Sequence, residues 1–142
     1  AGGRPQGFEP GTPAIAAAVA WDAALAMLEE AGMAALERHV GALASRAQRG
    51  LSAMAGVQVV GGARRASGSL VGFAVAGVHP HDVSALLDAR GVLVRAGHHC
   101  ARPLHAALGF PASVRASFAG YSTDEDVDAL LSAVERIVEE GV

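Results

Sequence analysis

The sequence contains no lysine: all 11 basic side chains among its 142 residues are arginines. Chemistry that needs a lysine amine, such as a Schiff base with a carbonyl compound, therefore cannot use a side chain of this sequence. The single cysteine excludes a framework of internal disulfides. The formal net charge is −3, and no basic stripe of the kind found in nucleic-acid-binding proteins is present, so we expect no nucleic-acid partner.

No apolar run approaches the length of a membrane span, and no succession of charged, apolar and small residues marks a signal peptide. We therefore expect a cytoplasmic protein with no membrane contact. The length is that of one domain. The chain begins with Ala1 in a segment rich in glycine and proline, and we expect it to be the C-terminal part of a longer protein.

The one cysteine, Cys100, follows His98 and His99 directly and lies between Arg95 and Arg102. The thiolate is the nucleophilic form of cysteine, and neighbouring cations favour it. A free cysteine is more commonly a small buried hydrophobe, but four ionisable neighbours favour a reactive thiol here. A zinc site is the weaker alternative, because adjacent residues rarely converge on one ion and structural zinc sites use spaced ligand pairs.

The motif Arg-x-Gly-His-His-Cys-Ala-x-Pro-Leu, from Arg95 to Leu104, resembles the active-site loop of the SUF-type (SufS-like, group II) cysteine desulfurases and selenocysteine lyases. These are pyridoxal-phosphate enzymes of the class V aminotransferase superfamily. The resemblance implies conversion of L-cysteine to L-alanine with a persulfide left on Cys100, and many members also cleave selenocysteine. It implies a homodimer that passes sulfur to an acceptor protein of the SufE or SufU kind for iron–sulfur cluster assembly. The cofactor, pyridoxal 5'-phosphate, would need a lysine outside this chain, so we expect the isolated chain to be inactive.

The resemblance also implies roles for individual residues. Arg115, in an Arg-Ala-Ser segment, would hold the α-carboxylate of the substrate, and the planar fork of an arginine suits that task. Arg95 would help to bind the substrate, and His98 and His99 would line the site and add positive charge near the thiol. The motif departs from the family at Arg102, where glutamine or methionine is common.

A second motif, Phe-Glu-x-Gly-Thr-Pro at residues 8–13, has two compatible interpretations. Thr12 followed by Pro13 is typical of a helix start, with Thr12 as the N-cap. In the resembled family the motif lies at the subunit interface, which implies that Thr12 contacts the cofactor phosphate of the neighbouring subunit. We assign residues 1–12 to the larger cofactor domain or its interface, and residues 13–142 to a C-terminal small domain.

The order of elements predicts an α+β domain with a small, largely antiparallel sheet and helices packed on one side. The family resemblance implies the same fold, that of the small C-terminal domain of a fold-type I pyridoxal-phosphate transferase. The expected helices are Pro13–Ala31, which Gly32 ends, Ala34–Ala55, Asp82–Ala89, Ala101–Leu108 and one that follows a capping box at Ser122–Glu125, and the expected strands are Val57–Val60, Leu70–Val75, Gly91–Val94 and Val114–Phe118. Helical spacing in the last helix predicts one apolar face, formed by Val127, Leu130, Leu131, Val134, Ile137 and Val138. Alternation in the last strand predicts Val114, Ala116 and Phe118 on one face and Arg115 and Ser117 on the other.

A function of a different class is the alternative. The chain would then be a non-catalytic pseudo-enzyme or interaction module that binds a sulfur-transfer or metal partner through its histidines and cysteine, namely His79, His81, His98, His99 and Cys100. His79 and His81 do not share a helix face, which argues against a metal-ligand pair. An exposed loop with two histidines could still contact a partner protein.

Overall fold

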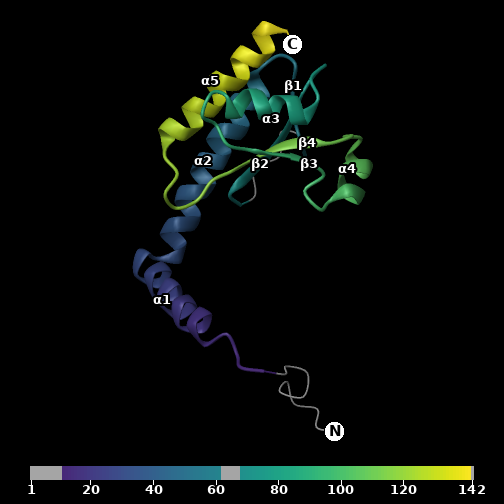
Figure 1. Ribbon diagram of the computed structural model, residues 1–142. Coiled ribbons are helices and arrows are strands. Elements are labelled where there is room, and N and C mark those ends of the chain that lie inside the picture. Colours follow the sequence, from purple (N-terminus) through teal and green to yellow (C-terminus); the bar gives the residue numbers. More distant parts are fainter. Residues whose placement is uncertain (1–10, 62–67, 142) are drawn as a thin grey trace. The chain divides into compact units, whose positions relative to one another are not determined.

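The computed structural model describes residues 11–61 and 68–141 (Figure 1). The chain divides into two compact units, Ala1–Leu36 and Glu37–Val142. No helix in the described ranges is long and apolar enough to span a lipid bilayer. The helices are α1 (Ile15–Ala31), α2 (Met33–Ala53), α3 (Pro80–Asp88), α4 (Arg102–Leu108) and α5 (Asp124–Glu140), and the strands are β1 (Val57–Val59), β2 (Leu70–Val75), β3 (Arg95–Gly97) and β4 (Ser113–Ser117).

The strands form one antiparallel sheet in the order β1-β2-β4-β3 (Figure 1). In the register of β2 and β4, Val114 lies opposite Phe73, and Arg115 lies opposite Gly72. Side chains alternate between the two faces of a strand, so Val114 and Ala116 project to one face and Arg115 to the other. Val114 and Phe73 are fully buried. One face of the sheet is therefore apolar, and the opposite face carries the candidate arginine, as the sequence predicts.

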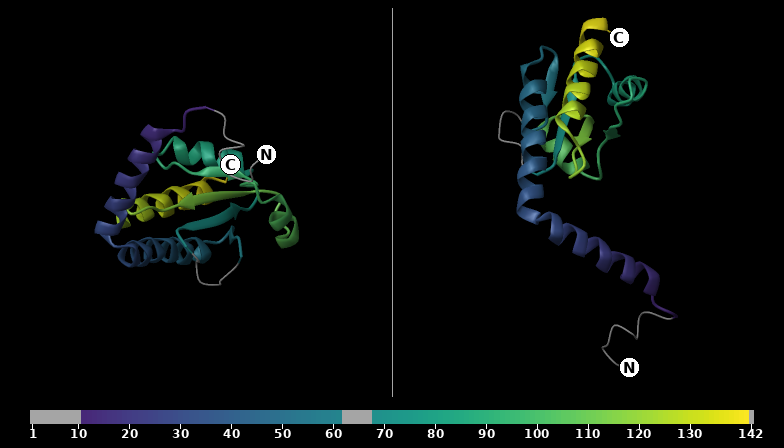
Figure 2. Two further views of the ribbon diagram at one scale, coloured as in Figure 1. Left: turned by 90° about the horizontal axis from the view of Figure 1, so that it is seen from below. Right: turned by 90° about the vertical axis from the view of Figure 1, so that its left-hand side faces the viewer.

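Helices α2, α3 and α5 cover the apolar face (Figure 2). Their buried side chains and those of the two central strands form one core, which contains no residue of α4. This arrangement confirms the expected α+β fold with an antiparallel sheet and helices packed on one side. The largest fully buried hydrophobic side chains of the core are Leu51, Phe73, Val83, Leu87, Val114, Val127, Val134 and Ile137.

Helices α2 and α5 run side by side and approach closely at Gly50 (Figure 2). A Cβ atom added at Gly50 would lie 2.5 Å from Cδ1 of Leu131 in α5. Arg46 of α2 also forms ion pairs with α5, at 3.3 Å to Asp124 Oδ1 and 2.6 Å to Asp128 Oδ1. The missing side chain at Gly50 thus allows the two helices to pack against each other.

We expect Gly41→Ala to stabilise the protein by about 1 kcal/mol, because alanine is the better helix former and the new Cβ meets no atom within 4 Å. Gly50→Ala brings the same gain in helix propensity but must displace Leu131. We therefore expect Gly50→Ala to be less stable than Gly41→Ala by roughly 1 kcal/mol or more. Denaturant unfolding of both variants beside the parent measures the difference. Equal stabilisation by both substitutions would contradict the close packing of α2 and α5.

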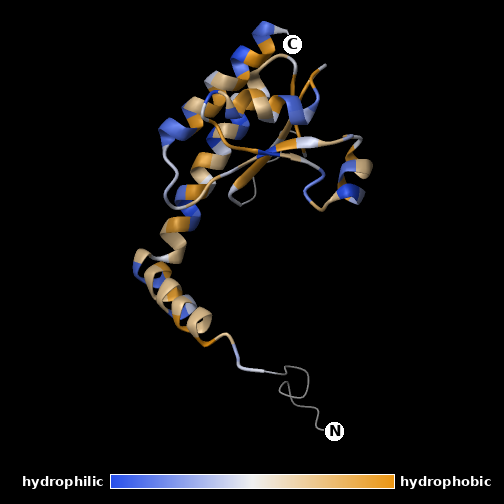
Figure 3. Cartoon of the chain, in the orientation of Figure 1, coloured by the Kyte–Doolittle hydropathy of each residue, from blue (hydrophilic) through white to orange (hydrophobic). Residues whose placement is uncertain are grey.

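In the Ala1–Leu36 unit, α1 begins later than predicted. Its N-cap is Ala14, which makes no side-chain capping bond, so the prediction of Thr12 as N-cap is wrong. The Ile15 amide donates to the Pro13 carbonyl at 2.8 Å, which forms a tight turn before the helix starts. Gly32, with a φ of 83°, ends α1 as predicted. No residue of α1 is buried, although apolar colours run along the helix (Figure 3).

Helix α3 starts two residues before the predicted Asp82. Its N-cap is His79, whose Nδ1 atom accepts a hydrogen bond from the His81 amide at 3.3 Å. Pro80 then occupies the first helical turn, where its missing N–H costs nothing. Asp82 therefore lies inside the first turn, where its negative charge interacts favourably with the helix dipole.

The predicted strand Gly91–Val94 is wrong, because β3 follows it at Arg95–Gly97. Val92 and Val94 pack against the core, whereas Leu93 is 81% exposed. The run thus alternates between inside and outside as a strand would, but only Arg95–Gly97 pair with β4. The alternation of apolar residues thus indicates which side chains are buried, but it does not indicate which residues form backbone hydrogen bonds with the neighbouring strand.

The capping box of α5 is formed by Thr123 and Asp126 rather than by Ser122 and Glu125. The Asp126 carboxylate accepts from the Thr123 amide at 2.8 Å, and the Thr123 hydroxyl accepts from the Asp126 amide at 3.4 Å. The Ser122 hydroxyl is engaged elsewhere, because it accepts from the Ala119 amide. The predicted apolar face of α5 is confirmed by its buried residues, which are Val127, Leu130, Ala133, Val134 and Ile137.

Candidate active site

Strands β3 and β4 place two arginines opposite each other. Arg95 pairs with Arg115 in the antiparallel register, so both side chains leave the same face of the sheet. Neither forms an ion pair with a carboxylate among the residues that the structure describes. Like charges directly opposite each other are unfavourable. The pair is therefore an environment that favours a bound anion.

Arg115 is the more enclosed of the two arginines. It is half-buried, whereas Arg95 is exposed. The buried Nε–H of Arg115 has no hydrogen-bond partner within the described residues. A buried donor without a partner costs free energy, and a ligand that accepts its hydrogen bond would recover that cost. This geometry suits the predicted binding of a carboxylate by Arg115, which stays a prediction.

Cys100 lies in a turn with an unusual backbone conformation. His99 and Cys100 have φ angles of 53° and 57°, and no other residue except glycine has a positive φ in ranges 11–61 and 68–141. The Ala101 amide closes the turn by donating to the His98 carbonyl at 2.8 Å. Left-handed backbone is unfavourable for residues with a Cβ atom and is typical of functional sites. The thiol is exposed and unpaired, which contradicts the alternative of a buried structural cysteine.

His99 connects this turn to β4, because its Nε2 atom lies 3.1 Å from the Ser113 carbonyl oxygen. Burial lowers the pKa of His99 below its usual value, and the nearby positive charge of Arg115 lowers it further, while the bond to Ser113 opposes both effects. The lowered pKa favours the neutral ring, whose Nε2–H donates to the Ser113 carbonyl oxygen. This shift runs against the positive charge that His99 is expected to add near Cys100, which stays a prediction.

His105 is a residue that the sequence analysis does not single out. It lies in α4 and is 4% exposed. Its Nδ1 atom lies 3.1 Å from the Ala101 carbonyl oxygen, and its Nε2 atom lies 2.9 Å from the Ser113 hydroxyl. The ring also contacts the rings of His98 and His99, with centroids 5.8 and 5.9 Å away. The clustering of three histidines near the only cysteine was the available signal.

The other predicted site residues lie elsewhere. The rings of His79 and His81 stack at 5.4 Å, and in the described ranges no hydrogen bond or ring contact joins them to Cys100. The same residues contain no group of three or more His, Cys, Asp or Glu side chains placed to hold a metal ion. Thr12 is exposed, and its contact with a cofactor phosphate stays a prediction. Residues 8–10 of its motif lie outside the described residues.

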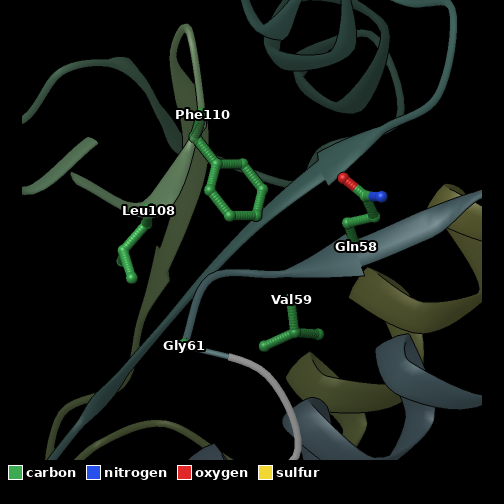
Figure 4. A pocket seen from close by; sticks show the side chains of 5 residues that line it. All are labelled: Gln58, Val59, Gly61, Leu108 and Phe110. Carbon is green, nitrogen blue, oxygen red and sulfur yellow. The ribbon is translucent and has the colours of Figure 1, made fainter. Parts of the chain in front are cut away.

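A cavity of about 580 Å³ opens between β1 and the end of α4 (Figure 4). Gln58 and Val59 of β1 line one side of it, and Leu108 and Phe110 line the other. Gly61 also lines the cavity, and among the described lining residues Gln58 has the only polar side chain. No predicted site residue contacts this cavity, which is therefore distinct from the Cys100 turn.

Curated proteins with similar sequences are named as cysteine desulfurases. The chain is 47% identical over 135 residues to a "Probable cysteine desulfurase" of Halalkalibacterium halodurans. It is 45% identical over 136 residues to "Probable cysteine desulfurase 2" of Mycobacterium leprae. These alignments cover 95% of this chain and 33% and 32% of the two relatives. The chain thus spans about a third of the length of the curated relatives it matches.

Solved structures show the same relationship. An apo cysteine desulfurase from Thermococcus onnurineus superposes with a TM-score of 0.88 at 38% identity, over 96% of this chain and 34% of that one. The cysteine desulfurase CsdA (S-sulfonic acid) from Escherichia coli gives 0.86 at 40% identity, over 96% and 33%. The sequence profile described as "Aminotransferase class-V" matches residues 1–130. The chain therefore belongs to the class-V aminotransferase family.

Proposed function

We propose that this chain is the C-terminal part of a pyridoxal-phosphate-dependent cysteine desulfurase. The main support for the proposal is the hydrogen-bonded connection between the turn that carries the exposed Cys100 thiol and the strand that carries Arg115. The Cys100 turn is hydrogen-bonded through His99 to β4, and β4 carries Arg115 opposite Arg95. A nucleophilic thiol next to an anion-binding strand suits a sulfur-containing amino acid, and the names of the relatives support L-cysteine.

In this reaction L-cysteine and the Cys100 thiol give L-alanine and a persulfide on Cys100. The thiolate attacks the sulfur of the substrate, so a sulfur–sulfur bond forms while the carbon–sulfur bond breaks. The electron pair stays with the substrate carbon, which takes up a proton and becomes the methyl group of alanine. Arg115 binds the α-carboxylate and directs the substrate sulfur to the thiol, Arg95 adds positive charge, and His98 and His99 line the site.

The cofactor implied by the family, pyridoxal 5'-phosphate, is held as a Schiff base on a lysine and withdraws electrons from the substrate amine. The residues of this chain do not fit that bond by themselves, because the chain has no lysine. We propose that the lysine lies in the larger cofactor domain, with residues 1–12 belonging to that domain or its interface and residues 13–142 forming the small domain. In a homodimer, Thr12 would contact the cofactor phosphate of the neighbouring subunit.

The isolated 142-residue chain is expected to retain no stoichiometric pyridoxal phosphate and to form no alanine from L-cysteine, because it lacks the lysine. Incubation with the cofactor, desalting and an absorbance spectrum test this expectation, and the complete protein serves as the positive control. A stoichiometric coloured complex of the isolated chain would contradict the proposed division of the site.

The sulfur must leave Cys100 before the thiol can react again, so the proposed reaction needs a sulfur acceptor. We propose an acceptor of the SufE or SufU kind and a role in iron–sulfur cluster assembly in the cytoplasm. Selenocysteine is a second substrate of the same site in this proposal, since it presents the same carboxylate and a more reactive chalcogen.

The test is to incubate the complete protein with L-cysteine, measure alanine, and determine the mass of the peptide that contains Cys100. We expect alanine to form and the peptide to gain the mass of one sulfur atom before an acceptor or reductant is added. A persulfide confined to another cysteine, or no alanine, would contradict the proposal. The absence of alanine would favour the alternative of a non-catalytic module that binds a partner through its histidines.

A further inference from the structure

We propose that His105 and Ser113 act together as positioning residues that hold Cys100 in its left-handed turn, at a fixed place relative to Arg115. The starting point is the backbone of the turn. Two consecutive residues with Cβ atoms, His99 and Cys100, both have positive φ angles. Such a conformation persists only where the surroundings hold it in place. The contacts on either side of Cys100 show what holds it.

Both ends of the turn are tied to a single residue of the sheet. On one side, the His99 ring donates to the Ser113 carbonyl oxygen at 3.1 Å. On the other side, the His105 ring bonds to the Ala101 carbonyl oxygen at 3.1 Å and to the Ser113 hydroxyl at 2.9 Å. Ser113 therefore holds the residue before Cys100 directly and the residue after it through His105.

The chemistry of the two ring nitrogens makes His105 specific for this link. A carbonyl oxygen only accepts hydrogen bonds, so the Nδ1 atom of His105 carries the proton that Ala101 accepts. In the neutral ring, Nε2 then accepts from the Ser113 hydroxyl. Both side chains are buried, at 4% and 1% exposure, so each would lose a partner that water does not replace if the other were removed.

The anchor is rigid because Ser113 belongs to a paired strand. It lies opposite Gly97 of β3, and Arg115 follows two residues later on the same face of β4. The brace formed by His105 and Ser113 therefore links the position of the thiol to the position of the guanidinium. A substrate held by its carboxylate must present its sulfur to the thiol, and small displacements of a reacting group lower rates strongly.

This inference rests on the proposed desulfurase function. Three variants of the complete protein test it. Ser113→Ala removes the hydroxyl and keeps the carbonyl that His99 uses. His105→Asn keeps an N–H near the Nδ1 position for Ala101 and loses the atom that meets Ser113. The third variant combines both substitutions, and Ser117→Ala is the matched control, because Ser117 is an exposed serine on the same face of β4.

We expect kcat for alanine formation to fall at least about tenfold in both single variants, with KM for L-cysteine within about twofold of the parent. Because each substitution breaks the same bond, the double variant should lose no more than either single one. Hydrogen exchange of the amides of residues 98–101 should become faster than in Ser117→Ala, and the buried group left without a hydrogen-bond partner should lower the melting temperature below that of this control. The proposed positioning role would be contradicted by kcat values that match Ser117→Ala or by unchanged hydrogen exchange at residues 98–101. Losses of kcat that add in the double variant would also contradict it.

The exchange measurement keeps the two proposals separable. If the parental protein forms no alanine, the proposed function falls, and the exchange rates of the turn in Ser113→Ala and His105→Asn still decide the brace. If the parental protein is active and neither the exchange rates nor kcat responds to these substitutions, the brace falls and the proposed function stands.

Discussion

Cys100→Ser is expected to lower alanine formation from L-cysteine by at least about 100-fold, because serine cannot accept sulfur as a persulfide and removing a nucleophile costs most of the rate. The exposed position of the side chain makes a structural effect of this near-isosteric exchange small. Binding of L-cysteine should persist, because Arg95 and Arg115 are unchanged. The measurement is a comparison of kcat and of the apparent affinity for L-cysteine between variant and parent.

Arg102→Gln is the matched control for this variant. It changes a residue of the same motif, adds no bulk, and introduces the glutamine that is common at this position in the resembled family. We expect a much smaller loss of rate than in Cys100→Ser, because Arg102 is only one of the four ionisable neighbours of the thiol and forms no ion pair with the described residues. If Cys100→Ser formed alanine at the parental rate, Cys100 would not be the nucleophile.

Local patterns in the sequence predicted the features that depend on local chemistry. The run Leu70–Val75 is a strand with the predicted bounds, and the alternation within β4 placed Arg115 on the face opposite Val114. The apolar spacing of α5 predicted the face that packs on the sheet. These predictions hold because each element buries one face, so its apolar residues recur with the period of a helix or a strand.

Features that depend on pairing between distant segments could not be predicted from the sequence. The register that sets Arg95 opposite Arg115 comes from contacts made only in the folded sheet, and the same pairing places β3 after the predicted Gly91–Val94. His105 looked like an ordinary helix residue, because its importance comes from Ser113 on a different element. The left-handed turn was equally hidden, since glycine is the usual signal for it.

Arg115→Ala is expected to raise KM for L-cysteine by about 30- to 1,000-fold, which corresponds to roughly 2–4 kcal/mol for the loss of a charge-assisted contact to the carboxylate. Arg115 offers this contact because its buried Nε–H has no partner in the described part of the chain. Arg115→Lys should recover only part of the loss, since a point charge cannot reproduce the two parallel hydrogen bonds of a guanidinium. Arg136→Ala, which removes an exposed arginine of α5, serves as the control.

The reactivity of the thiol separates substrate binding from damage to the site. In Arg115→Ala, alkylation of the peptide that contains Cys100 should proceed at a rate close to that of the control, because Ser113 and His105 still hold the turn. An unchanged KM would refute Arg115 as the carboxylate-binding residue. A raised KM together with a large change in alkylation would instead mean that Arg115 supports the turn through His99, whose ring lies within the electrostatic reach of its guanidinium. The two measurements together thus assign the contact to substrate or to protein.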